Sequence, residues 1–148
     1  MPSNAPLSKA ARITAWILQI AVAGIFATAG FAKLSGAPES VGVFETLGVE
    51  PWGRYGTGLA EVVAAVFLLV PRAAVFGAML SLGVITGAIG SHLTKLGIRV
   101  AMPDGTDDGG TMFGMAVAVC LASATVLFIR RAQLPLIGHA SGDGPSEH

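Results

Sequence analysis

Charged side chains are scarce in this sequence of 148 residues. Asp, Glu, Lys and Arg make up 12% of the chain, against roughly a quarter in a typical soluble domain. Hydrophobic residues make up 53%, and the mean hydropathy is +0.70. This composition excludes an ordinary water-soluble domain and indicates a protein that lies in a lipid bilayer.

Cysteine and net charge are almost absent as well. A single cysteine, Cys120, excludes an internal disulfide and a CxxC redox pair, so any thiol chemistry would need a partner protein. Nine basic and nine acidic side chains give a formal net charge of zero, so nucleic acid is not an expected partner. Paired histidines for a haem and a glycine-rich nucleotide motif are lacking too. We therefore expect no intrinsic cofactor.

Four apolar runs occupy most of the chain, at residues 13–34, 55–70, 73–91 and 111–129. At about 1.5 Å of rise per residue, each run is close to the length that crosses a hydrocarbon core of roughly 30 Å, the second being slightly short. Only Pro71 and Arg72 separate the second run from the third, which predicts a tight antiparallel hairpin. The sequence therefore predicts an all-α fold, a transmembrane four-helix bundle.

This prediction divides the chain into three parts. Residues 13–131 form the membrane domain, residues 1–12 a cytoplasmic N-terminal segment, and residues 132–148 a mobile C-terminal tail. Basic residues next to the first and fourth runs place both termini in the cytoplasm. An alternative is cleavage at the "ATA" of residues 27–29, which resembles a signal-peptidase site. The apolar run continues past that point, which favours an uncleaved span.

A short helix is predicted in the first polar connection. Pro38 suits a first helical turn, Gly48 suits the end, and Val41, Phe44 and Leu47 recur at a spacing of three. Such a helix would lie at the membrane interface. Its expected role is a lid over the bundle, and the alternative is a docking face for a ligand or a partner.

The second polar connection contains Asp104, Asp107 and Asp108. Their spacing does not match an EF-hand, and no glutamate follows at the twelfth position. A turn in which Asp108 caps the fourth helix is the favoured interpretation. We predict no metal site.

Small residues recur every fourth position in three of the runs: Gly56, Ala60 and Ala64; Gly83, Gly87 and Ser91; Gly110, Gly114, Ala118 and Ala122. Such stripes favour close packing of helices within the bundle. The alternative is a subunit interface in a homo-oligomer. Gln19 and Thr28 are expected to hydrogen-bond between helices, and Cys120 to be a small core residue.

Three polar residues within or at the end of apolar runs are the candidate site: Lys33, Glu61 and His92. Glu61 lies roughly 9 Å inside its span if the hydrocarbon core begins near Tyr55. Helical side chains tilt towards their own N-terminus, so the antiparallel helices would bring the three groups together. They would then form either a structural ion pair or a site that holds a ligand or a proton.

The order of several motifs resembles the DoxX family of small four-helix membrane proteins. These motifs are "GFAKL", "FETLGVEPW", "GLAEVVAAVFLLVPR", "GAMLSLGVITGAIGSHLTKLG" and "DDGGTMFGMAVAV". The resemblance implies a bacterial inner-membrane protein, and some members accompany quinone-linked oxidoreductases. It also matches the family's lysine, glutamate and histidine positions to Lys33, Glu61 and His92.

Three functions follow from these observations. The leading hypothesis is an accessory membrane subunit of a redox or quinone-linked assembly, with no catalytic residues of its own and a quinone held only through an oxidoreductase partner. The second is a small-molecule-binding or transporter-like protein that uses the Lys33, Glu61 and His92 cluster. The third is a purely structural membrane protein.

Overall fold

The computed structural model describes residues 7–131, which are mostly helical. Its elements are α1 (Lys9–Ser35), α2 (Pro38–Leu47), α3 (Trp52–Leu69), α4 (Ala74–Ser91), a short π-helix η1 (His92–Leu96) and α5 (Thr111–Arg130). The predicted tail at 132–148 lies outside the described residues. Helix α1 begins at Lys9 rather than at residue 13, because Ser8 caps it by accepting a hydrogen bond from the Ala11 N–H at 3.1 Å.

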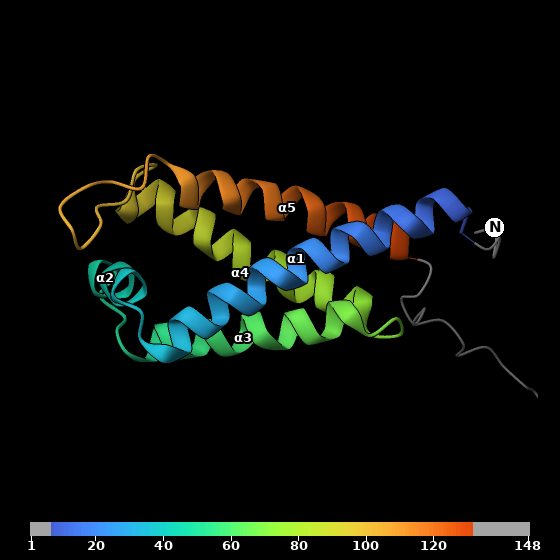
Figure 1. Cartoon of the computed structure of the whole chain (residues 1–148), viewed down its shortest axis with the longest axis horizontal. Coiled ribbons are helices and arrows are strands. Elements are labelled where there is room, and N and C mark those ends of the chain that lie inside the picture. The colour runs from blue at the N-terminus through green and yellow to red at the C-terminus, as the bar shows by residue number, and fades with distance from the viewer. Residues whose placement is uncertain (1–6, 132–148) are drawn as a thin grey trace, which may run out of the picture.

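The four long helices lie side by side (Figure 1). Helix α1 packs against α3 and α5, and α4 packs against the same two helices. Helix α2 and the loop of residues 97–110 lie at one end, which we call the loop end. The start of α1, the α3–α4 turn and the end of α5 lie at the other, which we call the terminal end.

Within residues 7–131, three helical segments are long and apolar enough to cross a membrane: α1, the continuous stretch Ala74–Leu96, and α5. Helix α3 is not among them, because Arg54 and Glu61 lower the hydropathy of its 18 residues. The predicted all-helical membrane fold is therefore confirmed, while the fourth span stays a prediction.

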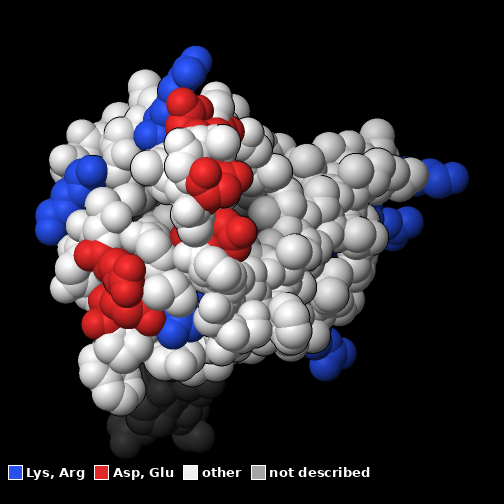
Figure 2. Space-filling model, turned by 60° about the vertical axis from the view of Figure 1, so that its left-hand side comes forward, with Lys and Arg blue, Asp and Glu red and all other residues white. Residues whose placement is uncertain are grey.

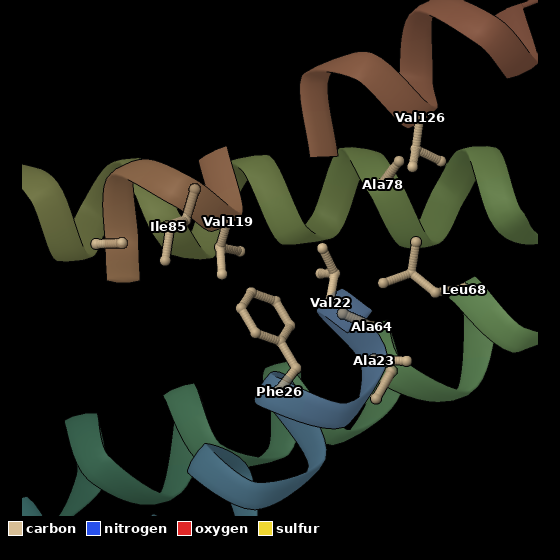
Figure 3. Packing of buried hydrophobic residues seen from close by; sticks show 11 residues of the cluster. Val22, Ala23, Phe26, Ala64, Leu68, Ala78, Ile85, Val119 and Val126 are labelled. Atoms are coloured by element: carbon tan, nitrogen blue, oxygen red, sulfur yellow. The ribbon is translucent and has the colours of Figure 1, made fainter. Parts of the chain in front are cut away.

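Small and medium-sized side chains fill the centre of the molecule (Figure 3). The aromatic ring of Phe26 lies among Val22, Ile85 and Val119. Many large apolar side chains point outward instead, including Ile17, Leu59, Val66, Leu121 and Phe128. Helices that are apolar on their outer faces as well are typical of proteins surrounded by lipid.

The hairpin between α3 and α4 is as tight as predicted. The N–H of Val70 donates to the carbonyl of Phe67 at 3.2 Å, and the N–H of Ala73 donates to the carbonyl of Val70 at 2.9 Å. A Cβ atom at Gly77 would lie only 2.6 Å from the backbone nitrogen of Leu68. Glycine at this position therefore lets the backbone of α4 touch that of α3.

Two other glycines set the closest contact between α1 and α3. A Cβ at Gly30 would lie 2.9 Å from the carbonyl oxygen of Gly58 and 2.8 Å from a methyl group of Val62. A Cβ at Gly58 would lie 3.0 Å from the Cβ of Lys33. The two helices can cross at this distance only because both positions lack a side chain.

The predicted small-residue stripes do not make most of these contacts, so the packing interpretation was wrong for four of their five glycines. A Cβ built at Gly56, Gly83, Gly87 or Gly114 would meet no atom within 4 Å. Spacing shows that a helix has a small-residue face, but not that another helix covers it. Their alternative role in a subunit interface stays a prediction.

Polar groups hold three helices together near the terminal end. Gln19, fully buried on α1, donates to the carbonyl of Leu68 on α3 and accepts from Nε of Arg130 on α5 at 3.0 Å. The prediction for Gln19 is confirmed. Thr28 instead is exposed and donates to Gly24 in its own helix, so it does not link helices. Cys120 packs partly buried against the core, as expected.

We expect the Gly30→Ala variant to be about 1 to 3 kcal/mol less stable than the wild type, because its methyl group would push α1 from α3. Thermal unfolding in a mild detergent measures this. Gly114→Ala is the matched control: its methyl group meets nothing, and alanine favours a helix. Equal losses in the two variants would show that the Gly30 contact is not tight.

Candidate functional site

Lys33 and Glu61 form the predicted ion pair. The ammonium group of Lys33, in the last turn of α1, lies 3.0 Å and 2.9 Å from the two carboxylate oxygens of Glu61 in the middle of α3. Glu61 is only 5% exposed. A buried carboxylate needs such a partner, since an isolated charge in a membrane is costly. The predicted contact between the two side chains is therefore present. A functional role of the pair stays a prediction.

The glycine contact between α1 and α3 explains why the pair forms. Lys33 follows Gly30 by three residues, and Glu61 follows Gly58 by three, so each charged side chain lies about one turn from the crossing. Because the helices are antiparallel, the two side chains approach each other from opposite directions. Glu61 shares its buried face with Gly58, Ala64 and Ala65, as the sequence predicted.

Arg54 is a further buried charge that sequence reasoning did not identify. It is 4% exposed, and its guanidinium donates to the backbone carbonyl of Lys33 and to the carboxylate of Glu50, at 2.8 Å and 3.0 Å from Nε. It also lies over the ring of Tyr55. Arg54 thereby satisfies a carbonyl at the end of α1, where a cation is favoured. The spacing of four between Glu50 and Arg54 was the available signal.

His92 begins η1 and is 6% exposed. Its Nδ1 lies 2.8 Å from the carbonyl oxygen of Gly97, and its ring meets that of Phe113 edge to face at 5.6 Å between centroids. Within residues 7–131, no hydrogen bond joins His92 to Lys33 or Glu61. The predicted cluster is therefore an ion pair with a separate histidine.

Asp108 organises the loop of residues 97–110. Its carboxylate accepts hydrogen bonds from the N–H groups of Val100 at 2.7 Å, Met112 at 2.8 Å and Gly110 at 3.0 Å. Burial would raise the pKa of Asp108, but these three donors, together with the electrostatic interaction with His92, outweigh it and hold the pKa below its usual value. The predicted capping of the fourth long helix by Asp108 is confirmed.

A cavity of about 700 Å³ opens among the helices towards the loop end. Lys33, Glu61 and His92 all lie in its wall. Most of the remaining wall is apolar, with side chains such as Ile25, Phe26, Val84, Ile85, Met115 and Val119. The structure thus brings the three predicted residues to one cavity, although only two of them touch.

Helix α2 covers part of this cavity. Phe44 is buried, and it lines the cavity together with Leu47. The ammonium group of Lys95 on η1 donates to the carbonyl of Leu47 at 3.1 Å and fixes the end of α2. Of the three apolar residues spaced by three, Phe44 and Leu47 thus line the cavity, whereas Val41 lines a second pocket together with Met102. This position favours the lid over the docking face.

The ion pair can be tested with a double-mutant cycle on Lys33→Met and Glu61→Leu. We expect Lys33→Met alone to cost about 3 kcal/mol, because it leaves a buried carboxylate unpaired, and the double variant to recover most of that loss. Glu61→Leu alone should cost less, since Lys33 at a helix end can reach water.

The exposed pair Arg99 and Asp107, 3.6 Å apart, is the control, with an expected coupling below about 1 kcal/mol. Thermal unfolding of all variants gives the coupling energies. Additive losses for Lys33 and Glu61 would contradict the pair as a unit.

Comparison with known proteins agrees with the resemblance seen in the sequence. No curated protein and no solved structure matches the chain. A family model, described as the DoxX-like family, matches residues 17–103, which is more than half of the chain. The matched range contains Lys33, Glu61 and His92. The chain therefore belongs to the DoxX-like family of proteins.

Proposed function

We propose that this protein binds an apolar small molecule with a polar group inside the membrane. The observation that carries the proposal is the cavity of about 700 Å³ whose mostly apolar wall contains the Lys33–Glu61 pair and His92. Ligand sites in proteins are commonly apolar cavities of about 300 to 1,000 Å³ with a few polar groups that orient the ligand.

The place of the polar groups also supports binding. A lysine–glutamate pair that serves only to hold two helices together does not need a cavity beside it. Here both residues line the cavity, and so does His92, which comes from a different helix. Ionisable groups inside a membrane protein are by default candidates for a functional site.

The proposal includes a fourth span and a defined orientation. Helix α3 packs against α1 and α4 along the bundle, and partners within the bundle satisfy its two charged side chains, Arg54 and Glu61. It can therefore cross the membrane despite its lower hydropathy.

The distribution of charge supports cytoplasmic termini. In the described part of the chain, every Asp and Glu lies in α2, in α3 or in the loops of the loop end (Figure 2). The charged side chains of the terminal end are all basic: Lys9, Arg12, Arg72, Arg130 and Arg131. Four basic residues lie towards the loop end: Lys33, Arg54, Lys95 and Arg99. An excess of basic residues favours the cytoplasmic side. Arg130 is weaker evidence for the orientation than the sequence indicated, because its side chain turns inward and donates to Gln19. For a bacterial protein, this orientation places the loop end on the outer side of the inner membrane.

A redox-linked role is the second candidate. The family resemblance implies an accessory subunit beside a quinone-linked oxidoreductase, and the apolar body of a quinone suits the mostly apolar wall of this cavity. In that case the partner would carry out the electron transfer, and this chain would hold the quinone near it.

Filling the cavity should remove ligand binding. We expect the amount of any co-purified small molecule to be about tenfold lower in Gly87→Leu than in the wild type. Gly87 lines the cavity and has space for a side chain, so a leucine there would fill part of the cavity. Mass spectrometry of protein purified in a mild detergent measures retained quinones, lipids and other small molecules. Gly114→Leu is the control, since that glycine also has open space but does not line the cavity. Equal retention in both variants would refute binding in this cavity.

The orientation can be tested with reporter fusions at two positions. A fluorescent protein fused after Arg131 should fluoresce, and alkaline phosphatase at the same position should be inactive, because that end lies in the cytoplasm. Phosphatase inserted at Gly105, in the loop of residues 97–110, should be active. A strong phosphatase signal after Arg131 would overturn this topology.

A further inference from the structure

We propose that the cavity selects neutral ligands that carry a hydroxyl group, with Nε2 of His92 accepting the hydrogen bond from that hydroxyl. This inference rests on the proposed function, because it assumes that the cavity binds a small molecule. It adds the class of ligand and the atom that recognises it.

The first step concerns which nitrogen of His92 carries the proton. The carbonyl oxygen of Gly97 can only accept a hydrogen bond, so Nδ1 of His92, 2.8 Å away, must donate. In the neutral imidazole the other nitrogen, Nε2, then carries the lone pair and is an acceptor. A carbonyl or ether group on a ligand would offer it no proton, whereas a hydroxyl would.

The second step concerns how firmly this arrangement is held. The N–H of Gly97 donates back to the carbonyl of His92 at 2.9 Å, so two hydrogen bonds close the same turn. Gly97 adopts a φ of 76°, which favours glycine over other residues. The edge-to-face contact with Phe113 fixes the plane of the ring. Turning the ring over would break the hydrogen bond between Nδ1 and the carbonyl of Gly97.

The third step concerns the availability of Nε2. The ring is almost fully buried and lies in the cavity wall, and no residue in the range 7–131 forms a hydrogen bond with Nε2. Nε2 is therefore available to a ligand, and a ligand hydroxyl can donate a hydrogen bond to it, whereas a ligand without a donor cannot.

The remaining charged groups of the wall disfavour an anionic ligand. Lys33 and Glu61 compensate each other through two contacts, so the lysine is not left for a ligand carboxylate. Glu39, also in the wall, adds a negative charge. A cationic ligand would have to compete with Lys33 for Glu61. A neutral hydroxyl needs neither rearrangement.

Four matched probes of similar size test this inference: 1-naphthol, its methyl ether 1-methoxynaphthalene, 1-naphthoate and 1-naphthylmethylammonium. Binding to the full chain in lipid nanodiscs is measured by titration calorimetry, with empty nanodiscs subtracted. We expect 1-naphthol to bind about five- to tenfold more tightly than the methyl ether, which matches about 1 kcal/mol for one hydrogen bond. Both charged probes should bind more weakly than 1-naphthol.

Two variants identify the acceptor. In His92→Phe the advantage of 1-naphthol over the methyl ether should vanish. In His92→Gln, whose amide oxygen is also an acceptor, part of that advantage should return, which keeps the test valid if the phenylalanine variant does not fold.

The outcomes separate the two proposals. Equal binding of 1-naphthol and its methyl ether to the wild type, or tightest binding of a charged probe, would overturn the hydroxyl selection and leave the cavity as a binding site. An unchanged naphthol advantage in both His92 variants would overturn the role of His92. If none of the four probes binds, the proposed function fails together with this inference.

Discussion

The contact between the backbones of α1 and α3 at Gly30 and Gly58 is the constraint on which the rest of the structure depends. It brings the two helices close enough for Lys33 and Glu61 to meet through two hydrogen bonds, one turn away. A carboxylate in the middle of an apolar helix is tolerated only with such a partner. Without this contact, α3 would carry a buried charge that no side chain compensates.

The same contact explains how α3 belongs to the bundle although its hydropathy is low. Its two charged side chains both point to α1: Glu61 to the ammonium group of Lys33, and Arg54 to the carbonyl of the same residue. Lys33 is therefore bound through both its side chain and its backbone. A membrane-spanning helix whose polar groups bind neighbouring helices does not need to be as apolar as one that faces lipid on all sides.

The sequence was sufficient to predict the helices, the tight hairpin and the Lys33–Glu61 pair, because apolar run length and side-chain tilt are local properties. It could not predict which glycines lie in helix contacts. Gly30, Gly58 and Gly77 touch a neighbouring helix, whereas Gly83 and Gly87 line the cavity. All five are equally small, and only the arrangement of the helices in three dimensions distinguishes them. The partners of Arg54 and His92 depended on that arrangement too.

The two halves of the molecule thus use small residues and polar groups in different ways. Towards the terminal end, Gln19 joins three helices, and side chains such as Leu68 and Val126 fill the centre. Towards the loop end, glycines on α4 leave space, and α2 covers part of it. The packed half can hold the helices in place while the other half keeps a cavity open. The packing of the first half then offsets the stability that the protein loses by leaving the cavity unfilled. This division is consistent with the location of Lys33, Glu61 and His92 in the cavity wall.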